Sequence, residues 1–364
     1  MRKFTNRNLL AACSIAALVL IASLPGMTQQ RQVQKPRRGV EVVRRDAEKR
    51  VDILVENRPF TSYLYTDTMP VLKKPVLYPL RTARGTIITR GYPLTPQPGE
   101  RADHPHHIGF WFNYGDVNGL DFWNNSDAIA PERRQEMETI RHRSINLTEN
   151  GENTGKLEVT MDWLKPDGIA ILREDTRFVF HTGPNMRGID RITTLTALDE
   201  RVSFRDNKEG LIAMRVCRAL EHPTNEPIEL TDASGKITKV PAMDNTGVTG
   251  MYTSSQGLTG SEVWGKRAAW VMLAGVVAGD SVTVAIFDHP QNAGHPSSWH
   301  ARGYGLFAAN PLGQKVFSEG KEELNFALAP RASTTFRHRV LILSGIVSAE
   351  QMAEKYREFI LYAK

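Results

Sequence analysis

Residues 157–198 read LEVTMDWLKPDGIAILREDTRFVFHTGPNMRGIDRITTLTAL, and this stretch decides the fold class. It holds three short runs rich in Val, Ile, Thr, Phe and Leu, at 157–163, 176–181 and 189–198. The segments between them carry Gly, Pro, Asn and Asp. Short β-branched and aromatic runs separated by turn residues are typical of antiparallel strands. This part of the chain therefore predicts an antiparallel β-sheet.

The same pattern extends along the chain from Val51, whereas helical periodicity is nearly absent before the C-terminus. Further strands are predicted at 51–55, 60–65, 85–89 and 282–287. Ser348-Ala-Glu-Gln351 reads as a capping box, and apolar residues then recur at helical spacing through Lys364, which predicts one amphipathic terminal helix. We expect an all-β fold, a large antiparallel β-sandwich with a C-terminal helix, whose working loops lie on one face or rim.

The N-terminus has the layout of a secretory signal. Three basic residues precede an apolar run at 9–24, and the breaker Pro25-Gly26 follows it. We expect a signal peptide at 1–26, a basic leader at 27–45 and a single β-sandwich domain at 46–364. The mature protein is expected to be periplasmic or secreted, with cleavage of the signal and retention as an uncleaved anchor both open. No second apolar segment is long enough to span a membrane.

The composition excludes several classes of protein. With 364 residues, 41% of them hydrophobic and 24% charged, the chain can bury a full-size core. The net charge is +6, and three of the cations lie in the signal, which leaves a nearly balanced surface. No nucleic-acid motif is present, and no nucleic-acid partner is expected. The two cysteines, Cys13 in the signal and Cys217, exclude a disulfide framework and Cys-ligated metal clusters.

A first polar cluster is the segment DHPHHIGFWF at 103–112, which places Asp103, His104, His106 and His107 within five positions. Neutral imidazoles beside a carboxylate suit general acid/base work near neutral pH, and they also suit zinc, copper or iron. The structural alternative is that one or two of these histidines bond the backbone in a turn. We interpret the cluster as a candidate site.

A second polar cluster follows the apolar strand predicted at 282–287. It repeats the triplet Asp-His-Pro, here at Asp288 to Pro290, and continues to Gly313. Its side chains with catalytic or binding chemistry are His289, His295, His300, Arg302 and Tyr304. A β-sandwich exposes loops after its strands, so this loop is a second candidate site, although it also fits a long loop packed by its aromatic residues.

Two further features complete the set of candidates. Glu209 precedes a turn glycine, at the start of a strand that ends near Arg215, and it suits a general acid or base. Trp264 and nearby cations suit stacking on a sugar ring with hydrogen bonds to its hydroxyl groups.

Several motifs together resemble one known family. They are YPLRT, ITRGYPL, DHPHHIGFWF, GDVNGLDFW, KEGLIAMRV, VWGKRAAWV, FDHPQN and WHARGYGLFAANPLG, in this order between Lys74 and Gly313. The chain resembles the PmoA-like family, which carries the label methane oxygenase PmoA. The membrane subunit behind that label is a bundle of transmembrane helices, so membrane copper oxygenation is not expected of this β-rich chain. The resemblance implies an exported protein with a fold similar to the large sandwich of galactose-mutarotase-like carbohydrate enzymes.

The sequence leaves three functions open. The favoured one is a carbohydrate-active enzyme or binding protein of mutarotase, lyase or hydrolase type, acting on a small-molecule or polysaccharide substrate. The residues assigned to catalysis are His104, His107, Glu209 and His300, and those assigned to substrate binding are Trp264, Arg302, Tyr304 and His289. No metal ligand is assigned and the cofactor is unspecified.

The other two functions use the same histidines differently. A soluble metalloenzyme, an oxygenase or a hydrolase, would hold a metal through His104, His106 or His107 with His289 or His300. A non-catalytic envelope binding module would use the histidines only to organise loops.

Overall fold

The strands that the sequence predicts show alternating burial of their side chains. A computed structural model describes residues 39–69, 71–124, 131–232, 234 and 236–362, so the predicted signal lies outside the described residues. In β2 (Arg50–Val55), Val51, Ile53 and Val55 are buried, and the residues between them are only partly buried. Successive residues of a strand point to opposite faces of its sheet, so this strand presents an apolar face to a core.

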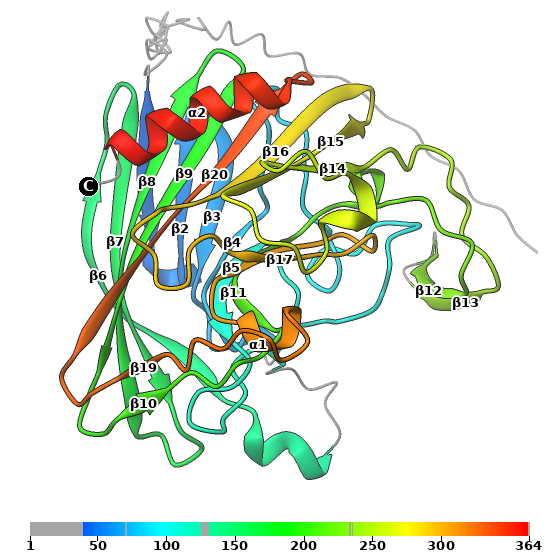
Figure 1. Ribbon diagram of the computed structural model, residues 1–364. Helices are drawn as coiled ribbons and strands as arrows, with labels where there is room; N and C mark the ends of the chain where they lie inside the picture. Colours follow the sequence, from blue (N-terminus) through cyan, green and yellow to red (C-terminus); the bar gives the residue numbers. More distant parts are fainter. Residues whose placement is uncertain (1–38, 70, 125–130, 233, 235, 363–364) are drawn as a thin grey trace, which may run out of the picture. The chain divides into compact units, whose positions relative to one another are not determined.

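Two eight-stranded sheets carry most of the chain (Figure 1). The first sheet contains, in spatial order, β1 (Val40–Arg45), β2, β3 (Arg58–Leu64), β4 (Val76–Tyr78), β5 (Phe110–Tyr114), β11 (Gly210–Arg215), β18 (Leu306–Asn310) and β17 (Ser298–Ala301). The second contains β14 (Met251–Ser254), β15 (Trp270–Val277), β16 (Asp280–Asp288), β20 (Ser333–Ser344), β9 (Met186–Ala197), β8 (Ala170–Gly183), β7 (Thr154–Leu164) and β6 (Thr139–Glu149). All neighbouring strands in both sheets are antiparallel.

Shorter elements connect and flank the sheets. Two small two-stranded sheets pair β10 (Val202–Ser203) with β19 (Ala327–Leu328), from distant parts of the chain, and β12 (Ile228–Thr231) with β13 (Ile237–Val240). The 3-10 helices span Asp46–Glu48, Pro131–Glu136, Arg218–Leu220 and Gly260–Val263, and the α-helices are α1 (Gln314–Phe317) and α2 (Ala349–Tyr362).

The main core lies between the two sheets. Its aromatic contacts cross from one sheet to the other: Phe60 of β3 meets Phe180 of β8, and Phe112 of β5 meets Trp163 of β7, with ring centroids 6.3 Å apart in each pair. Buried side chains from both sheets belong to one contiguous apolar cluster. The predicted antiparallel β-sandwich with a C-terminal helix is confirmed.

The terminal helix covers the outer face of the second sheet (Figure 1). Ser348 and Gln351 exchange bonds at its start: Ser348 N donates to Gln351 Oε1 over 2.9 Å, and Gln351 N donates to Ser348 Oγ over 3.3 Å. Met352 and Phe359 are fully buried against Phe287 and its neighbours in the sheet. The predicted capping box and amphipathic face are confirmed.

Two local predictions differ from the structure. Val40–Arg45, assigned to the basic leader, form β1, because Val40 and Val42 alternate into the core while the arginines remain near solvent. Residues 85–89 form no strand; Ile87 and Thr89 make only isolated bridges, to Arg81 and Val216. Among the residues that the structure describes, no helix has the length and apolar character needed to cross a membrane.

Candidate functional site

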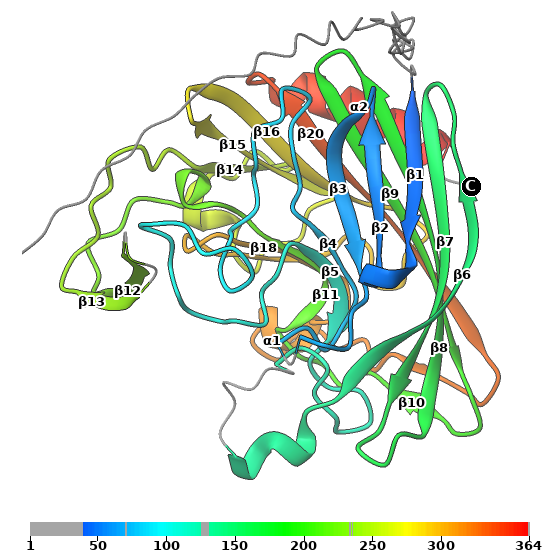
Figure 2. The ribbon, with the colours of Figure 1, turned by 180° about the vertical axis from the view of Figure 1, so that it is seen from behind.

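The candidate site lies on the outer face of the first sheet, over β5, β11, β18 and β17. Strand alternation sorts the side chains there: Phe110 and Phe112 point into the main core, whereas Trp111 belongs to a separate apolar cluster on the other face. The segment between β4 and β5, cyan in Figure 2, lies beside this face and carries the histidine cluster. Arg215 at the end of β11 and His300 in β17 are buried beneath it.

Asp103 is the charged centre of this face. Its Oδ1 accepts from Arg90 Nη1 over 2.8 Å and from Arg215 Nη2 over 2.7 Å, and it lies 3.3 Å from His104 Nδ1. Burial acts to raise the pKa of Asp103, but the bond from His104 and the two guanidinium charges outweigh it and hold that pKa well below its usual range. The carboxylate is therefore ionised at neutral pH.

Arg90 fixes the loop that carries the histidines. Besides Asp103, its guanidinium donates to the carbonyl oxygens of His104 and His107, over 2.9 and 3.2 Å. Burial and the nearby charge of Arg215 lower the pKa of Arg90 to about 9. A buried arginine that binds several carbonyl groups holds the loop in one conformation.

The histidine rings form a stack. His104 adopts the left-handed region at φ 43°, and its ring lies parallel to His107 at 4.8 Å and to Tyr304 at 5.4 Å. His107 in turn stacks on Trp111 at 5.3 Å. His104 is 42% exposed at the side chain, whereas His107 is buried. His104 is therefore the member of this stack best placed to meet a ligand.

His107 has a supporting position. Its Nδ1 lies 3.2 Å from Arg215 Nη1, and because a guanidinium only donates, this nitrogen accepts and the proton sits on Nε2. Burial and the neighbouring His106 lower the pKa of His107 well below its ordinary value. The structure thus places His107 beneath His104, as a neutral platform. His106 is buried beside it, and neither of its ring nitrogens has a hydrogen-bond partner among the described residues.

Glu209 and His300 lie close together near the start of β11. Glu209 Oε2 lies 3.8 Å from His300 Nδ1, and Lys208 Nζ lies 3.1 Å from the other carboxylate oxygen. His300 Nδ1 bonds the Lys208 carbonyl oxygen over 3.1 Å, so it carries the proton and leaves Nε2 as an acceptor. Burial lowers the pKa of His300 to about 4, which keeps the ring neutral at pH 7.

Trp264, Arg302 and Tyr304 border an open pocket of about 440 Å³. The Arg302 guanidinium carbon lies 5.3 Å from the Trp264 ring centroid and 5.7 Å from that of Tyr304. Trp264 is 40% exposed, which is high for a tryptophan. The pocket is also lined by Arg101, His222, Pro223, Thr224, Glu226, Ser261, Ala301 and Gly303. It combines exposed aromatic surface with several hydrogen-bond donors.

One chain of contacts joins most of the residues that the sequence singled out. His104 stacks on Tyr304, Tyr304 meets Arg302, Arg302 meets Trp264, and the Trp264 ring lies 6.5 Å from that of His300, which pairs with Glu209. The two clusters therefore meet, through their 103–107 and 300–304 parts.

His289 does not lie with them. It packs edge-on against Phe359 of α2, with centroids 5.4 Å apart, and Gln291 N donates to its Nδ1 over 3.2 Å. The assignment of His289 to substrate binding is not supported by this placement, because α2 covers the end of β16 from which it projects.

A model of one protein family matches residues 50–357, and its description is Family of unknown function (DUF6807). The chain belongs to this family. The resemblance to the methane oxygenase PmoA family is therefore wrong, since the matching family is DUF6807 and its function is unknown. No curated protein matches the chain.

Solved structures similar to this DUF6807 chain include two α-galactosidases and a mutarotase-like protein. The galactosidase domain of an alpha-galactosidase-sucrose kinase has 10% identity and TM-score 0.38 over 85% of this chain and 42% of that one. The Lactobacillus brevis alpha-galactosidase has 11% identity and TM-score 0.38, and the match covers 88% of this chain and 42% of the galactosidase. A galactose mutarotase-like protein from Clostridium acetobutylicum has 9% identity and TM-score 0.33, and the match covers 82% of this chain and 93% of the mutarotase-like protein. The chain spans about two fifths of the length of these galactosidases, and similarities at this level do not determine its function.

Several residues of the site in this DUF6807 protein were not found from its sequence. Glu221 is buried beside the pocket, and its Oε2 accepts from Arg101 Nε over 2.8 Å. Its Oε1 is buried and has no hydrogen-bond partner within the part of the chain that the structure describes. Burial raises the pKa of Glu221. His222, next in the chain, lines the pocket. Arg90 lies within the motif ITRGYPL, but its role as a loop anchor has no sequence signature.

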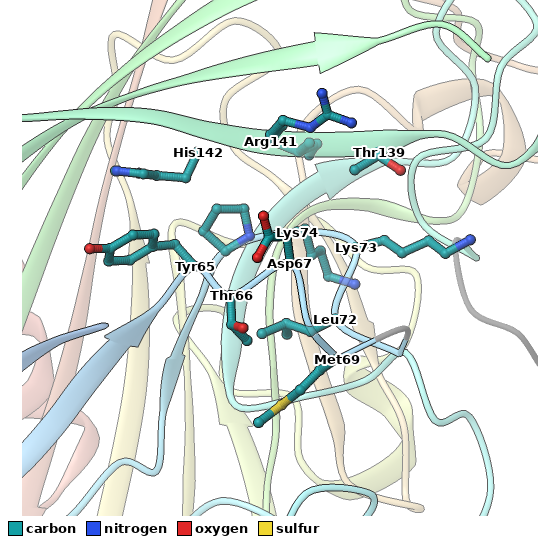
Figure 3. A pocket seen from close by; sticks show the side chains of 12 residues that line it. Tyr65, Thr66, Asp67, Met69, Leu72, Lys73, Lys74, Thr139, Arg141 and His142 are labelled. Carbon is teal, nitrogen blue, oxygen red and sulfur yellow. The ribbon is translucent and has the colours of Figure 1, made fainter. Parts of the chain in front are cut away.

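A second pocket of about 220 Å³ opens between the segment after β3 and strand β6 (Figure 3). Tyr65, Asp67 and Met69 line it on one side, and Arg141 and His142 line it from β6. None of the residues assigned to catalysis or substrate binding lines this pocket.

Lys74 connects this second pocket to the histidine loop. Its Nζ donates to the His106 carbonyl oxygen over 3.0 Å and lies 5.4 Å from the Trp111 ring centroid, and burial lowers the pKa of Lys74 to about 7. Within the described part of the chain, no three His, Cys, Asp or Glu side chains are arranged to hold a metal ion.

Proposed function

We propose that this DUF6807 protein binds a carbohydrate on the outer face of the first sheet and transfers protons on the sugar with Glu209 and His300. The observation that carries the proposal is the chain of contacts from His104 through Tyr304, Arg302 and Trp264 to that pair. It joins exposed aromatic rings, a guanidinium and an acid/base pair at one pocket.

Aromatic rings and planar donors are the groups that recognise sugars. The exposed ring of Trp264 suits the apolar C–H face of a pyranose, and Arg302 and Ser261 at the same pocket supply donors for its hydroxyl groups. A pocket with exposed aromatic surface and a few polar groups is the usual form of a small-ligand site.

The protonation state of His300 supports proton transfer. At pH 7 the neutral His300 offers Nε2 as an acceptor while its Nδ1 bonds the Lys208 carbonyl oxygen. Glu209 Oε2 lies 3.8 Å from this Nδ1. The carboxylates of Asp103 and Glu221 both bind arginines, so the site favours one carboxylate with one imidazole over the carboxylate pair of a retaining hydrolase.

A screen of purified protein against a saccharide panel, followed by calorimetry, tests the proposal. Trp264→Ala should weaken binding about tenfold or more, because it removes the exposed stacking surface. Met251→Ala, which truncates another exposed apolar side chain away from the pocket, is the matched control and should leave affinity unchanged.

The catalytic part has its own variants. Glu209→Gln and His300→Gln should each lower turnover of a bound sugar by about 10²-fold or more while changing its affinity by less than threefold. If no saccharide of the panel binds, the proposal is refuted. If a saccharide binds and Trp264→Ala leaves its affinity unchanged, the binding site is not at this pocket.

We also propose that the protein acts outside the cytoplasm, on the basis of its N-terminal sequence. The basic residues, the apolar run at 9–24 and Pro25-Gly26 support export. Fractionation of cells that express the full chain, with N-terminal sequencing of the product, should give an exported protein shortened near position 26. A full-length product confined to the cytoplasm would refute this.

A further inference from the structure

Some cationic side chains around the pocket form ion pairs with carboxylates of the protein, and others do not. The carboxylates at the floor of the site each have a cationic partner: Asp103 binds Arg90 and Arg215, Glu221 binds Arg101, and Glu209 binds Lys208. Two buried guanidinium groups thus share the single carboxylate of Asp103. The protein leaves this face with a surplus of positive charge.

Arg302 has no anionic partner. Among the described residues, no carboxylate or carbonyl group lies within hydrogen-bonding distance of its guanidinium, although the side chain lines the pocket. Glu226 is the acidic residue in the pocket lining, and no ion pair joins it to Arg302 within the described part of the chain. The five donors of Arg302 are therefore available to a ligand.

Two aromatic rings hold this guanidinium in place. Trp264 and Tyr304 lie 5.3 and 5.7 Å from it, and Arg215 lies 4.7 Å from the Tyr304 ring. Stacking restricts the Arg302 side chain before a ligand arrives, so less conformational entropy is lost when it binds one. A planar, held guanidinium with free donors matches a carboxylate in a bidentate arrangement.

We infer that the sugar bound at this site carries a carboxylate, as a uronic acid does, and that Arg302 binds that carboxylate. The inference rests on the proposed function and names its substrate class. A neutral sugar would leave the surplus charge of this face uncompensated, whereas a uronate places its charge beside Arg302 and within the field of Arg215.

Calorimetry with matched pairs of ligands tests the inference. The probes are disaccharides that contain glucuronic or galacturonic acid, and the same disaccharides with the carboxyl group reduced to a primary alcohol. Wild-type protein should bind at least one uronate about tenfold or more tightly than its reduced counterpart, the ratio expected of a hydrogen-bonded charge pair. Arg302→Gln should reduce the ratio to about one, and Arg302→Lys should retain part of it because it keeps the charge but loses the planar fork.

Arg58→Gln, at the exposed first residue of β3, is the matched control and should leave the ratio unchanged. Equal affinity for both members of every pair would overturn the inference and leave the proposed function intact. Failure of all uronates and all neutral sugars to bind would overturn both. Tighter binding of a sulfated disaccharide than of any uronate would overturn the assignment of a carboxylate.

Discussion

Asp103 and Asp288 each begin the triplet Asp-His-Pro, but Asp103 is 30% exposed at the side chain and Asp288 is fully buried. Asp103 binds two arginines, and the histidine after it stacks on Tyr304 at the mouth of the site. The histidine after Asp288 packs beneath α2. The same three residues therefore form part of a site at one place and part of the interior at the other.

Asp288 is satisfied entirely by neighbouring protein groups. Its Oδ1 accepts from Asn292 Nδ2 over 2.7 Å, and its Oδ2 accepts from Ser297 N over 2.8 Å and lies 2.9 Å from His295 Nδ1. Its backbone oxygen accepts from Tyr356 Oη of α2 over 3.1 Å. Both carboxylate oxygens of Asp288 thus have partners inside the protein. Within the described part of the chain, the region around Asp103 instead retains an exposed imidazole, that of His104, and the Arg302 guanidinium, which has no anionic partner. The two triplets therefore differ in their surroundings: α2 covers the one at Asp288, and the one at Asp103 lies at the candidate site.

The largest effect that separates the two regions is on stability. Asp288→Ala should lower the free energy of unfolding by about 3–5 kcal/mol, because it strips a buried network of its central acceptor. Urea unfolding at pH 7 measures this. The control is Asp67→Ala, an exposed carboxylate, which should change stability by less than about 0.5 kcal/mol. A loss for Asp288→Ala as small as the control's would break the comparison.

Acid should destabilise the site region through His300. Its pKa is about 4 in the folded protein and about 6.5 in the unfolded chain, so between these values the unfolded chain binds more protons. Stability is therefore unaffected above pH 6.5 and falls as the pH decreases toward 4, by about 2–3 kcal/mol.

His300→Gln should remove that acid-dependent part of the loss. Urea unfolding of wild type and variant at pH 7 and pH 4.5 measures the difference. His338, in the covered region, also has a pKa lowered to about 4 by burial, so His338→Gln should remove a separate part, and the two effects should add. Identical pH profiles for wild type and His300→Gln would contradict the placement of that histidine.

Asp103→Ala should affect both the fold and the ligand. Asp103 is partly solvated and Arg90 keeps its bonds to carbonyl groups, but two buried guanidinium groups lose their shared carboxylate, so the expected loss of stability is about 2–3 kcal/mol. Binding of a saccharide should weaken about tenfold or more, because Arg215 and His104 lose the group that orients them. Calorimetry and urea unfolding on the same preparation separate the two effects. A loss as large as that of Asp288→Ala with unchanged affinity would reverse the roles assigned to the two carboxylates.

The sequence predicts the sandwich well because its strands alternate. Val51, Ile53 and Val55 mark one face of β2, and Ser348 with Gln351 marks the start of α2, so local signals suffice there. Residues 85–89 show the limit of these signals: their β-branched composition is that of a strand, but they pair with other segments at single positions only.

The site is predicted in part. His104, Arg302 and Glu209 were singled out because their side chains carry recognisable chemistry, and the fold brings them to one face. His289 was grouped with them because it lies in the same loop, and no local pattern reveals that α2 covers it. The sequence does not reveal the role of Arg90, because an arginine is expected at the protein surface. In the structure its guanidinium is surrounded by loop carbonyl oxygens and the Asp103 carboxylate.

The smallest expected effect concerns the helix that makes the two regions different. Ser348→Ala removes the side-chain bond to Gln351 N at the start of α2 and should cost about 0.5–1 kcal/mol. Because α2 contacts the Asp288 region and not the Asp103 region, amide hydrogen exchange should accelerate in α2 and around 288–297, while saccharide affinity stays at the wild-type value. Ser348→Thr keeps a hydroxyl cap and should behave as wild type. Faster exchange at 103–107 in the Ser348→Ala variant would show that α2 and the candidate site are coupled. The two triplets would then differ less than the structure indicates.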